Sequence, residues 1–238
     1  PETVQSELDM FTAFEDIPQT EKSSEEPSEG ESLDPNTSKE ENNGEGTLKE
    51  GENTDKKENA AGEDTEFSTG EIRDGVYVNK MFGVKFDGGA NSMEFTGRQE
   101  LNPEFYTDGN LNMEAVITGL KNGNKFIDMS ANGPQNGCYV TIEKTALKDI
   151  DSYIDSAISG LKAGYEEEGF NVNIEKSSVN FIGKDMPCIS IAANFEDSTI
   201  YQKLVFLKSE DYIYSVASFG ENEAFATAGL GMFTKLGD

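Results

Sequence analysis

Carboxylates are the residues in this chain most able to do chemistry, because histidine is absent. Of the 238 residues, 46 are Asp or Glu, 19 are Lys or Arg, and none is His or Trp. Without His, neither a Ser-His-Asp nor a Cys-His arrangement can be built, and the commonest zinc ligand is missing. An enzyme of this composition would be a hydrolase with two carboxylates about 5–10 Å apart in one cleft. The sequence does not identify which two acids would meet.

Three short patterns resemble ligand sites, but each is better explained without a ligand. Asp108–Glu114, "DGNLNME", alternates acid and amide side chains like a calcium loop, but Met113 and Gly119 stand where Gly and Glu are required. Gly183–Asp185 lacks the upstream glycine and the Ser/Thr of a phosphate loop and is typical of a hairpin turn. Glu166–Glu168 is typical of a solvated helix end. We therefore predict no catalytic residue, no metal and no cofactor.

Two cysteines, Cys138 and Cys188, each stand at the head of a predicted strand. A pair in an exported protein can form a disulfide if the two Cα atoms come within about 7 Å. Buried free cysteines also serve as small apolar residues. Both readings remain open, and the sequence favours free thiols.

The charge is strongly negative and unevenly distributed. The formal net charge is −27, which opposes binding to nucleic acid and to anionic membranes. Residues 1–70 hold 21 of the 46 acids but only 5 of the 19 basic residues. From residue 21 to residue 70 the only large apolar side chains are Leu33, Leu48 and Phe67, too few to offset the entropy of ordering the backbone. Residues 1–70 are predicted to be a disordered acidic tether.

A short amphipathic segment precedes most of this tether. Ser6–Pro18, "SELDMFTAFEDIP", opens with Ser-x-x-Asp and places Leu8, Phe11 and Phe14 at near-helical spacing. It is either a helix that folds on a partner or a nascent helix with no fixed role. The composition of the tail favours the second interpretation.

The remaining residues, 71–238, are predicted to form a single α+β domain built on an antiparallel sheet. A hairpin is expected around Asn79–Met81, and Asp87–Gly89 should form a turn. Ala90–Gly123 is expected to be helical or irregular, with one short helix after Asn102 and another over Asn112–Leu120. Strands are predicted at Lys125–Ala131 and Cys138–Lys144.

A long amphipathic helix and a four-strand meander complete this domain. Asp149–Phe170 carries one apolar stripe, with Gly169 as its C-terminal glycine. Four strand-like runs follow, "FNVNIEKSSVNFIG", "PCISIAANF", "IYQKLVFLK" and "YIYSVASF", joined by connections short enough to demand antiparallel hairpins. A final helix is predicted over Glu221–Leu236, weakened by Gly229 and Gly231.

The order of these elements carries a family resemblance. The string "YVNKMFGVKF", with "FIDMSA", "CYVTIEK", the long helix and the meander, resembles exported lipoproteins of Gram-positive anaerobes. Those in turn resemble the PsbP fold, shared with a small eukaryotic Ran-binding import factor. The resemblance implies an αβα sandwich, preceded by the disordered tether, whose relatives bind or scaffold. It implies an extracellular position at the cell surface, with a possible lipid anchor upstream of Pro1.

The function expected from these observations is a non-catalytic binding or scaffolding module of the cell surface. Its partner would be an unknown protein or cell-wall component, and Phe105 and Tyr106 are the candidate contact residues, although two aromatics beneath a short helix would serve structure alone. The chain is expected to be monomeric, without a transmembrane segment. The alternative is a His-free, carboxylate-dependent hydrolase acting at the cell envelope.

Overall fold

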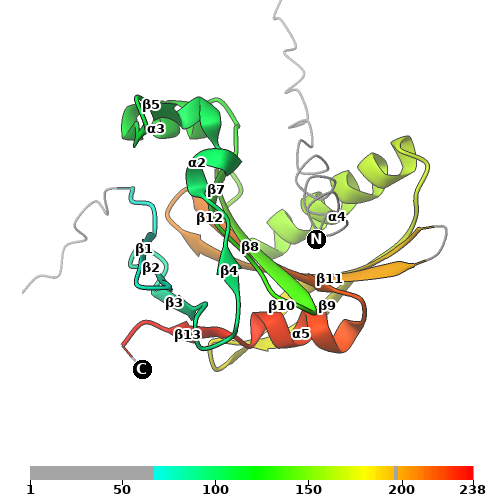
Figure 1. Cartoon of the computed structure of the whole chain (residues 1–238). Coiled ribbons are helices and arrows are strands. Elements are labelled where there is room, and N and C mark those ends of the chain that lie inside the picture. The colour runs from blue at the N-terminus through cyan, green and yellow to red at the C-terminus, as the bar shows by residue number, and fades with distance from the viewer. Residues whose placement is uncertain (1–66, 196–197, 238) are drawn as a thin grey trace, which may run out of the picture. The chain divides into compact units, whose positions relative to one another are not determined.

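A computed structural model describes residues 67–195 and 198–237, and they form an α+β fold dominated by antiparallel sheet (Figure 1). The predicted helix at 6–18 and all but the last four residues of the predicted tether lie outside the described residues. None of the helices formed by the described residues is long and apolar enough to cross a membrane. The helical elements are α2 (Arg98–Leu101), the 3-10 helix η1 (Pro103–Phe105), α3 (Met113–Lys121), α4 (Ile150–Glu167) and α5 (Glu223–Leu230).

The largest element is a seven-stranded antiparallel sheet with the order β4-β7-β8-β12-β11-β10-β9. The predicted strands and the four-strand meander are confirmed, because each consecutive pair from β9 to β12 is antiparallel. The bounds of the strands are β4 Glu94–Phe95, β7 Phe126–Asn132, β8 Asn136–Lys144, β9 Asn171–Phe181, β10 Lys184–Asn194, β11 Thr199–Ser209 and β12 Tyr212–Gly220.

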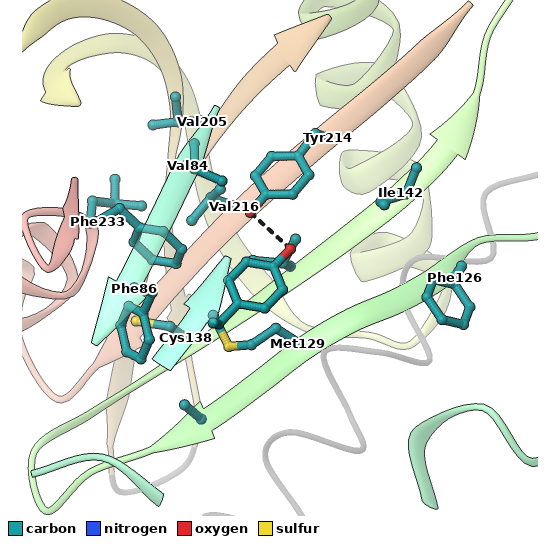
Figure 2. Packing of buried hydrophobic residues seen from close by; sticks show 14 of the residues in the cluster. Val84, Phe86, Phe126, Met129, Cys138, Ile142, Val205, Tyr214, Val216 and Phe233 are labelled. Carbon is teal, nitrogen blue, oxygen red and sulfur yellow. Dashed lines mark hydrogen bonds between the residues drawn. The ribbon is translucent and has the colours of Figure 1, made fainter. Parts of the chain in front are cut away.

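Each face of this sheet carries a buried apolar cluster, and the strand register assigns each side chain to one of the two faces. In β8 and β12, Val140 lies opposite Val216, and Tyr139 lies opposite Ala217. The face of Val140 packs with the apolar side chains of α3 and α5, whereas the face of Tyr139 packs with those of α4. Figure 2 shows part of the first of these two clusters. The sheet therefore lies between helices (Figure 1).

The long helix α4 forms where the apolar stripe predicted it. Asp149 caps its N-terminus by accepting a hydrogen bond of 2.8 Å from the amide of Ser152. The helix ends two residues before Gly169, whose φ is +78°. Ile154 and Leu161 are buried against the sheet. The prediction of a docked amphipathic helix is confirmed.

A second, four-stranded sheet has the order β1-β2-β3-β13. The predicted hairpin is confirmed as β2 (Val76–Asn79) and β3 (Val84–Asp87), but β1 (Glu71–Arg73) was not predicted. The predicted C-terminal helix is wrong in its second half: α5 ends at Leu230, and Phe233–Lys235 forms β13. Glycines at 229 and 231 weaken the helix. The ring of Phe233 packs on those of two other phenylalanines, of β3 and β9, which the helical path would not reach.

Candidate functional site

A buried carboxylate, that of Asp128 in β7, organises the polar interior of the molecule. Its side chain is fully buried and accepts hydrogen bonds from the amide of Gly70 at 2.8 and 3.0 Å. The hydroxyl of Tyr77 donates to it at 2.6 Å, and the amide group of Asn79 donates at 3.0 Å. The carboxylate thus joins the start of the described chain to strand β2.

Arg98 supplies the positive charge of this cluster. Its Nη2 lies 3.0 Å from a carboxylate oxygen of Asp128 and donates to the carbonyl of Gly70 at 2.9 Å. Its Nε and Nη2 also donate to the backbone carbonyl of Asp128 at 2.8 and 2.6 Å. A side chain at position 70 would clash with the ring of Tyr77, so only glycine fits there. We call Gly70, Tyr77, Asn79, Arg98, Asp128 and Tyr214 the Asp128 cluster.

The two tyrosines of the Asp128 cluster remain neutral. The hydroxyl of Tyr214 donates to that of Tyr77 at 3.1 Å, the bond drawn dashed in Figure 2. Burial raises the pKa of both phenols well above the ordinary value, and the negative charge of Asp128 raises it further. Both phenols therefore keep their protons at neutral pH and act as hydrogen-bond donors. The cluster is a structural clamp.

Two members of this clamp belong to the string that carried the family resemblance. Tyr77 and Asn79 are the first and third residues of "YVNKMFGVKF". Asp128 is the one acidic residue of "FIDMSA". Asn79 also accepts a 3.1 Å hydrogen bond from the amide of Phe82, which shapes the turn before β3. Tyr77 and Asn79 are 51 and 49 positions away from Asp128, so no local sequence pattern links the two strings. The available signal was the single carboxylate within a buried apolar strand.

Residues 98–124, which contain α2, η1, α3 and the small hairpin β5–β6 (Tyr106–Thr107, Asn110–Leu111), form an excursion fixed to β7. These elements lie together in Figure 1. The side chain of buried Asn102 donates a 2.8 Å hydrogen bond to the carbonyl of Ile127 and accepts one of 2.8 Å from its amide. It thus pairs with β7 in the way that the backbone of a neighbouring strand would. The rings of Phe105 and Phe126 lie 5.8 Å apart. Together with Arg98, these contacts hold the excursion in one position.

A shallow depression of about 470 Å³ lies between η1 and α3 of this excursion. Its lining combines two exposed carboxylates with hydrogen-bonding amides and a hydroxyl, above an aromatic floor. The N-terminus of α3 is fixed there by Asn112, whose side chain accepts a 3.1 Å hydrogen bond from the amide of Ala115. The lining residues are Glu104, Phe105, Asn112, Glu114, Ala115, Thr118, Gly119, Asn122 and Asn124.

The residues singled out from the sequence are distributed as follows. Phe105 is 3% exposed and lines the depression, whereas Tyr106 is half-buried in β5 and is not one of the lining residues. Asp108 forms the β5–β6 turn, with φ of +51°, and in the described residues no three Asp, Glu, Cys or His side chains gather as a metal site would require. Glu166–Glu168 is exposed at the end of α4, and Gly183–Asp185 lies at the β9–β10 hairpin.

Cys138 and Cys188 are free, buried thiols. They lie on β8 and β10, and β12 and β11 run between those strands. Three inter-strand spacings amount to about 14 Å, twice the largest Cα separation that a disulfide allows. Burial raises the pKa of the Cys138 thiol to about 12, which suits a packing role.

One further polar group pairs a serine with a lysine, as in His-free nucleophilic sites. Lys203 Nζ donates to Ser190 Oγ at 3.0 Å and lies 2.9 Å from a carboxylate oxygen of Glu223. An ammonium held in an ion pair has no lone pair with which to accept the serine proton. The group therefore ties α5 to the sheet.

Comparison with known proteins adds no family: no family model matches this chain, and no curated protein matches it.

Proposed function

We propose that this chain is a non-catalytic binding module and that the depression between η1 and α3 is its contact surface. The observation that carries the proposal is the attachment of the excursion to β7 through Arg98 and Asn102. A loop held in one conformation loses little entropy when it binds a partner. The exposed carboxylates and amides suit a protein or cell-wall component that offers amine, amide or hydroxyl groups.

The wider setting of the proposal is a cell-surface protein of PsbP-like, αβα-sandwich fold carried on a disordered acidic tether. The order of elements and the helices on both faces of the sheet support this fold. The composition of residues 1–70 supports the tether, and the resemblance to exported lipoproteins supports the extracellular position. We propose that the module acts as a monomer.

The alternative, a carboxylate-dependent hydrolase, is favoured by one observation: Glu104 and Glu114 line the same depression. The proton donor of a catalytic carboxylate pair is normally a buried group, because burial keeps it protonated. Both of these carboxylates are exposed. Binding is therefore the function that this geometry supports better.

A capture experiment with matched variants tests the proposal. The full chain is immobilised and exposed to solubilised cell envelope, as wild type and as Thr118→Arg, which places a long cation in the depression. Thr227→Arg is the control, because Thr227 is also an exposed helical threonine but lies on α5. We expect wild type and Thr227→Arg to recover the same component and Thr118→Arg to lose it. Equal recovery by all three would reject the depression as the contact surface.

The same experiment separates the hydrolase alternative. Glu104→Gln and Glu114→Gln would abolish turnover of a captured glycan or peptide while leaving its retention largely intact if these acids were catalytic. A binding module would release the captured component unchanged in every variant. Mass spectrometry of the eluted component gives this readout.

A further inference from the structure

Strand β9 forms one edge of the seven-stranded sheet. It stands last in the strand order, and among the described residues it pairs only with β10. Its eleven residues include no glycine or proline, and their pairing with β10 runs without a register shift. The strand at the opposite edge, β4, has two residues, and the edge strands of the smaller sheet, β1 and β13, have three each. Strand β9 is therefore the longest sheet edge in the part of the chain that the structure describes.

The hairpin between β9 and β10 determines which backbone groups of β9 point away from the sheet. Its two-residue turn, Ile182 and Gly183, has φ angles of +46° and +78°, the positive values of a type I′ turn. In such a hairpin the residues that flank the turn bond to each other, so Phe181 and every second residue before it bond to β10. The residues between them, such as Ser178, direct their N–H and C=O groups outward. Pro187 lies opposite Ser178, at a position where β10 donates no hydrogen bond to β9, which agrees with this assignment.

Most of β9 is open to solvent. Six of its eleven side chains are exposed, and only those of Ile174 and Phe181 are buried. Among the described residues no strand pairs with its outward groups, which belong to Val172, Ile174, Lys176, Ser178 and Asn180. A long, regular and unpaired edge of this kind binds a further strand through main-chain hydrogen bonds.

We propose that β9 binds an extended segment of a partner polypeptide, in which apolar and basic residues alternate, as an eighth strand of the sheet. The apolar residues are required on the α4 side, where Val172 and Ile174 pack with the apolar cluster of that face. The basic residues are required on the other side, where Glu175 is exposed, because opposite charges attract across two strands. Four strands separate β9 from β7, which holds the candidate depression, so this surface is distinct from that one.

The charge of the edge favours a basic segment over a second copy of this chain. If β9 paired with itself in the antiparallel register centred on Lys176, two lysines would lie opposite each other, and a register centred on Glu175 would oppose two glutamates. Lys176 is already compensated by Asp151 at 2.9 Å and Asp155 at 3.3 Å, so the edge as a whole is negative. A second copy also carries a net charge of −27, whereas a basic segment is attracted.

Binding of a designed nonapeptide to the full chain tests the proposal. The peptide, Thr-Val-Thr-Lys-Thr-Lys-Ile-Lys-Val with blocked ends and a fluorescent label, fits antiparallel to β9 with its Ile opposite Ile174 and a Lys opposite Glu175. One control peptide carries Glu for each Lys, and another carries N-methyl groups on its third, fifth and seventh residues, whose N–H groups would face β9. Fluorescence anisotropy should show saturable binding of the designed peptide and binding weaker by about tenfold or more for both controls. No binding of the designed peptide, or equal binding of the N-methylated one, would overturn the proposal.

Matched variants at one position locate the binding on β9. Ser178→Pro removes an outward N–H and leaves the ladder to β10 intact, which is where an edge strand tolerates proline. Ser178→Ala changes the same side chain but keeps the N–H. We expect Ser178→Pro to weaken binding of the designed peptide by about tenfold and Ser178→Ala to change it by less than about twofold. Circular dichroism checks that both variants fold, and equal binding by the two folded variants would contradict binding at this edge.

Hydrogen exchange resolved by residue with NMR gives a readout that needs no variant. In the free full chain the outward amides of Lys176 and Ser178 should exchange rapidly, whereas those of Glu175 and Ser177, bonded to β10, should exchange slowly. Saturating peptide should slow the outward amides by about tenfold or more and leave the inward ones unchanged. Slow exchange of the outward amides without peptide would mean that this chain or a second copy already covers the edge, and would reject the proposal. Peptide binding that leaves the outward amides fast would reject it equally.

Discussion

At the scale of single residues, Asp128 carries the largest individual consequence for stability. Its carboxylate is fully buried and is compensated by Arg98, by two side-chain donors and by a backbone amide. Removing one member of a buried ion pair leaves the other charge uncompensated in a medium that solvates it poorly. The remaining donors would then lack an acceptor. The fold therefore depends on this carboxylate more than on any exposed acid.

We predict that Asp128→Ala lowers the free energy of unfolding by about 3–5 kcal/mol. Urea unfolding followed by circular dichroism measures the change. Asp185→Ala serves as the control, because Asp185 is exposed at the β9–β10 hairpin, and its loss should change stability by no more than about 0.5 kcal/mol. Equal effects of the two substitutions would mean that the Asp128 cluster does not stabilise the fold.

The buried phenols predict a loss of stability in alkali. Tyr77 holds its proton more tightly in the folded than in the unfolded state, since burial and Asp128 raise its pKa above 10.0. The contribution of the protonated Tyr77 phenol to the free energy of unfolding is therefore complete below about pH 10. It is lost as the pH rises further, by about 1.4 kcal/mol per pH unit. Tyr77→Phe should remove that part of the slope in unfolding free energy between pH 10 and 11.

A second substitution separates the thiol from the phenols. The pKa of Cys138 is raised from 9.0 to about 12, so its contribution begins to decline near pH 9. Cys138→Ala should therefore make the free energy of unfolding nearly constant between pH 9 and 10. Above pH 10 this variant should still lose stability, because the phenols are unchanged. A wild-type stability that is constant from pH 9 to 11 would contradict both assignments.

At the scale of elements, α4 shows how a sequence pattern becomes packing. Its stripe predicted one buried side, and Ile154, Leu161 and Tyr165 are the residues that the sheet covers. On its outward side, Lys176 of β9 lies 2.9 Å from Asp151 and 3.3 Å from Asp155. These pairs are exposed and contribute little. Apolar contact with the sheet accounts for most of the docking.

We predict that Leu161→Ala destabilises the protein by about 2–5 kcal/mol, the range for a buried leucine that leaves a cavity. Chemical denaturation gives the value. Lys162→Ala, at the adjacent exposed position, is the matched control and should change stability by about 0.5 kcal/mol or less. A stability unchanged by Leu161→Ala would mean that α4 is not docked.

Local sequence patterns predicted most helices and strands. The features that they did not predict depend on contacts between residues far apart in the sequence. The meander, β7, β8 and α4 followed from periodicity and from short connections. The end of α5 was missed because Phe233 leaves the helix to pack on residues far away in the sequence. The Asp128 cluster was missed for the same reason: Gly70 and Asp128 are 58 positions apart. Of the two contact residues predicted from the sequence, Phe105 lines the depression and Tyr106 does not.

At the scale of the whole molecule, the described residues form two large sheets and the small β5–β6 sheet, and polar contacts hold the chain just before its first strand. Phe67 is 8% exposed and packs on Tyr212, and Gly70 is bonded to both Asp128 and Arg98. Within the described residues, burial and hydrogen bonds thus hold the chain from Phe67 and Gly70 onward, a few residues before β1.

We predict that limited proteolysis with a glutamate-specific protease cuts within residues 19–66 and leaves a resistant fragment that begins between Phe67 and Ile72. The linker offers many glutamates and little to bury, whereas the backbone after Phe67 is held by hydrogen bonds. N-terminal sequencing and intact mass identify the fragment. Survival of the full chain at protease levels that cut a denatured control would refute the tether.

The four-stranded sheet determines how this molecule would respond to a mechanical load. Strands β1 and β13 are its two edges, so the first and last described strands belong to the same sheet. A pull applied through the preceding chain would first load the bonds of Gly70 to Asp128 and Arg98, and only then the β1–β2 ladder. Within the seven-stranded sheet, only β7 accepts these bonds, through Asp128, and the β9–β12 meander and α4 supply none of them. If residues 1–70 hold the module to a surface, the buried Arg98–Asp128 pair would resist tension on them. Most of the core would carry little of that tension.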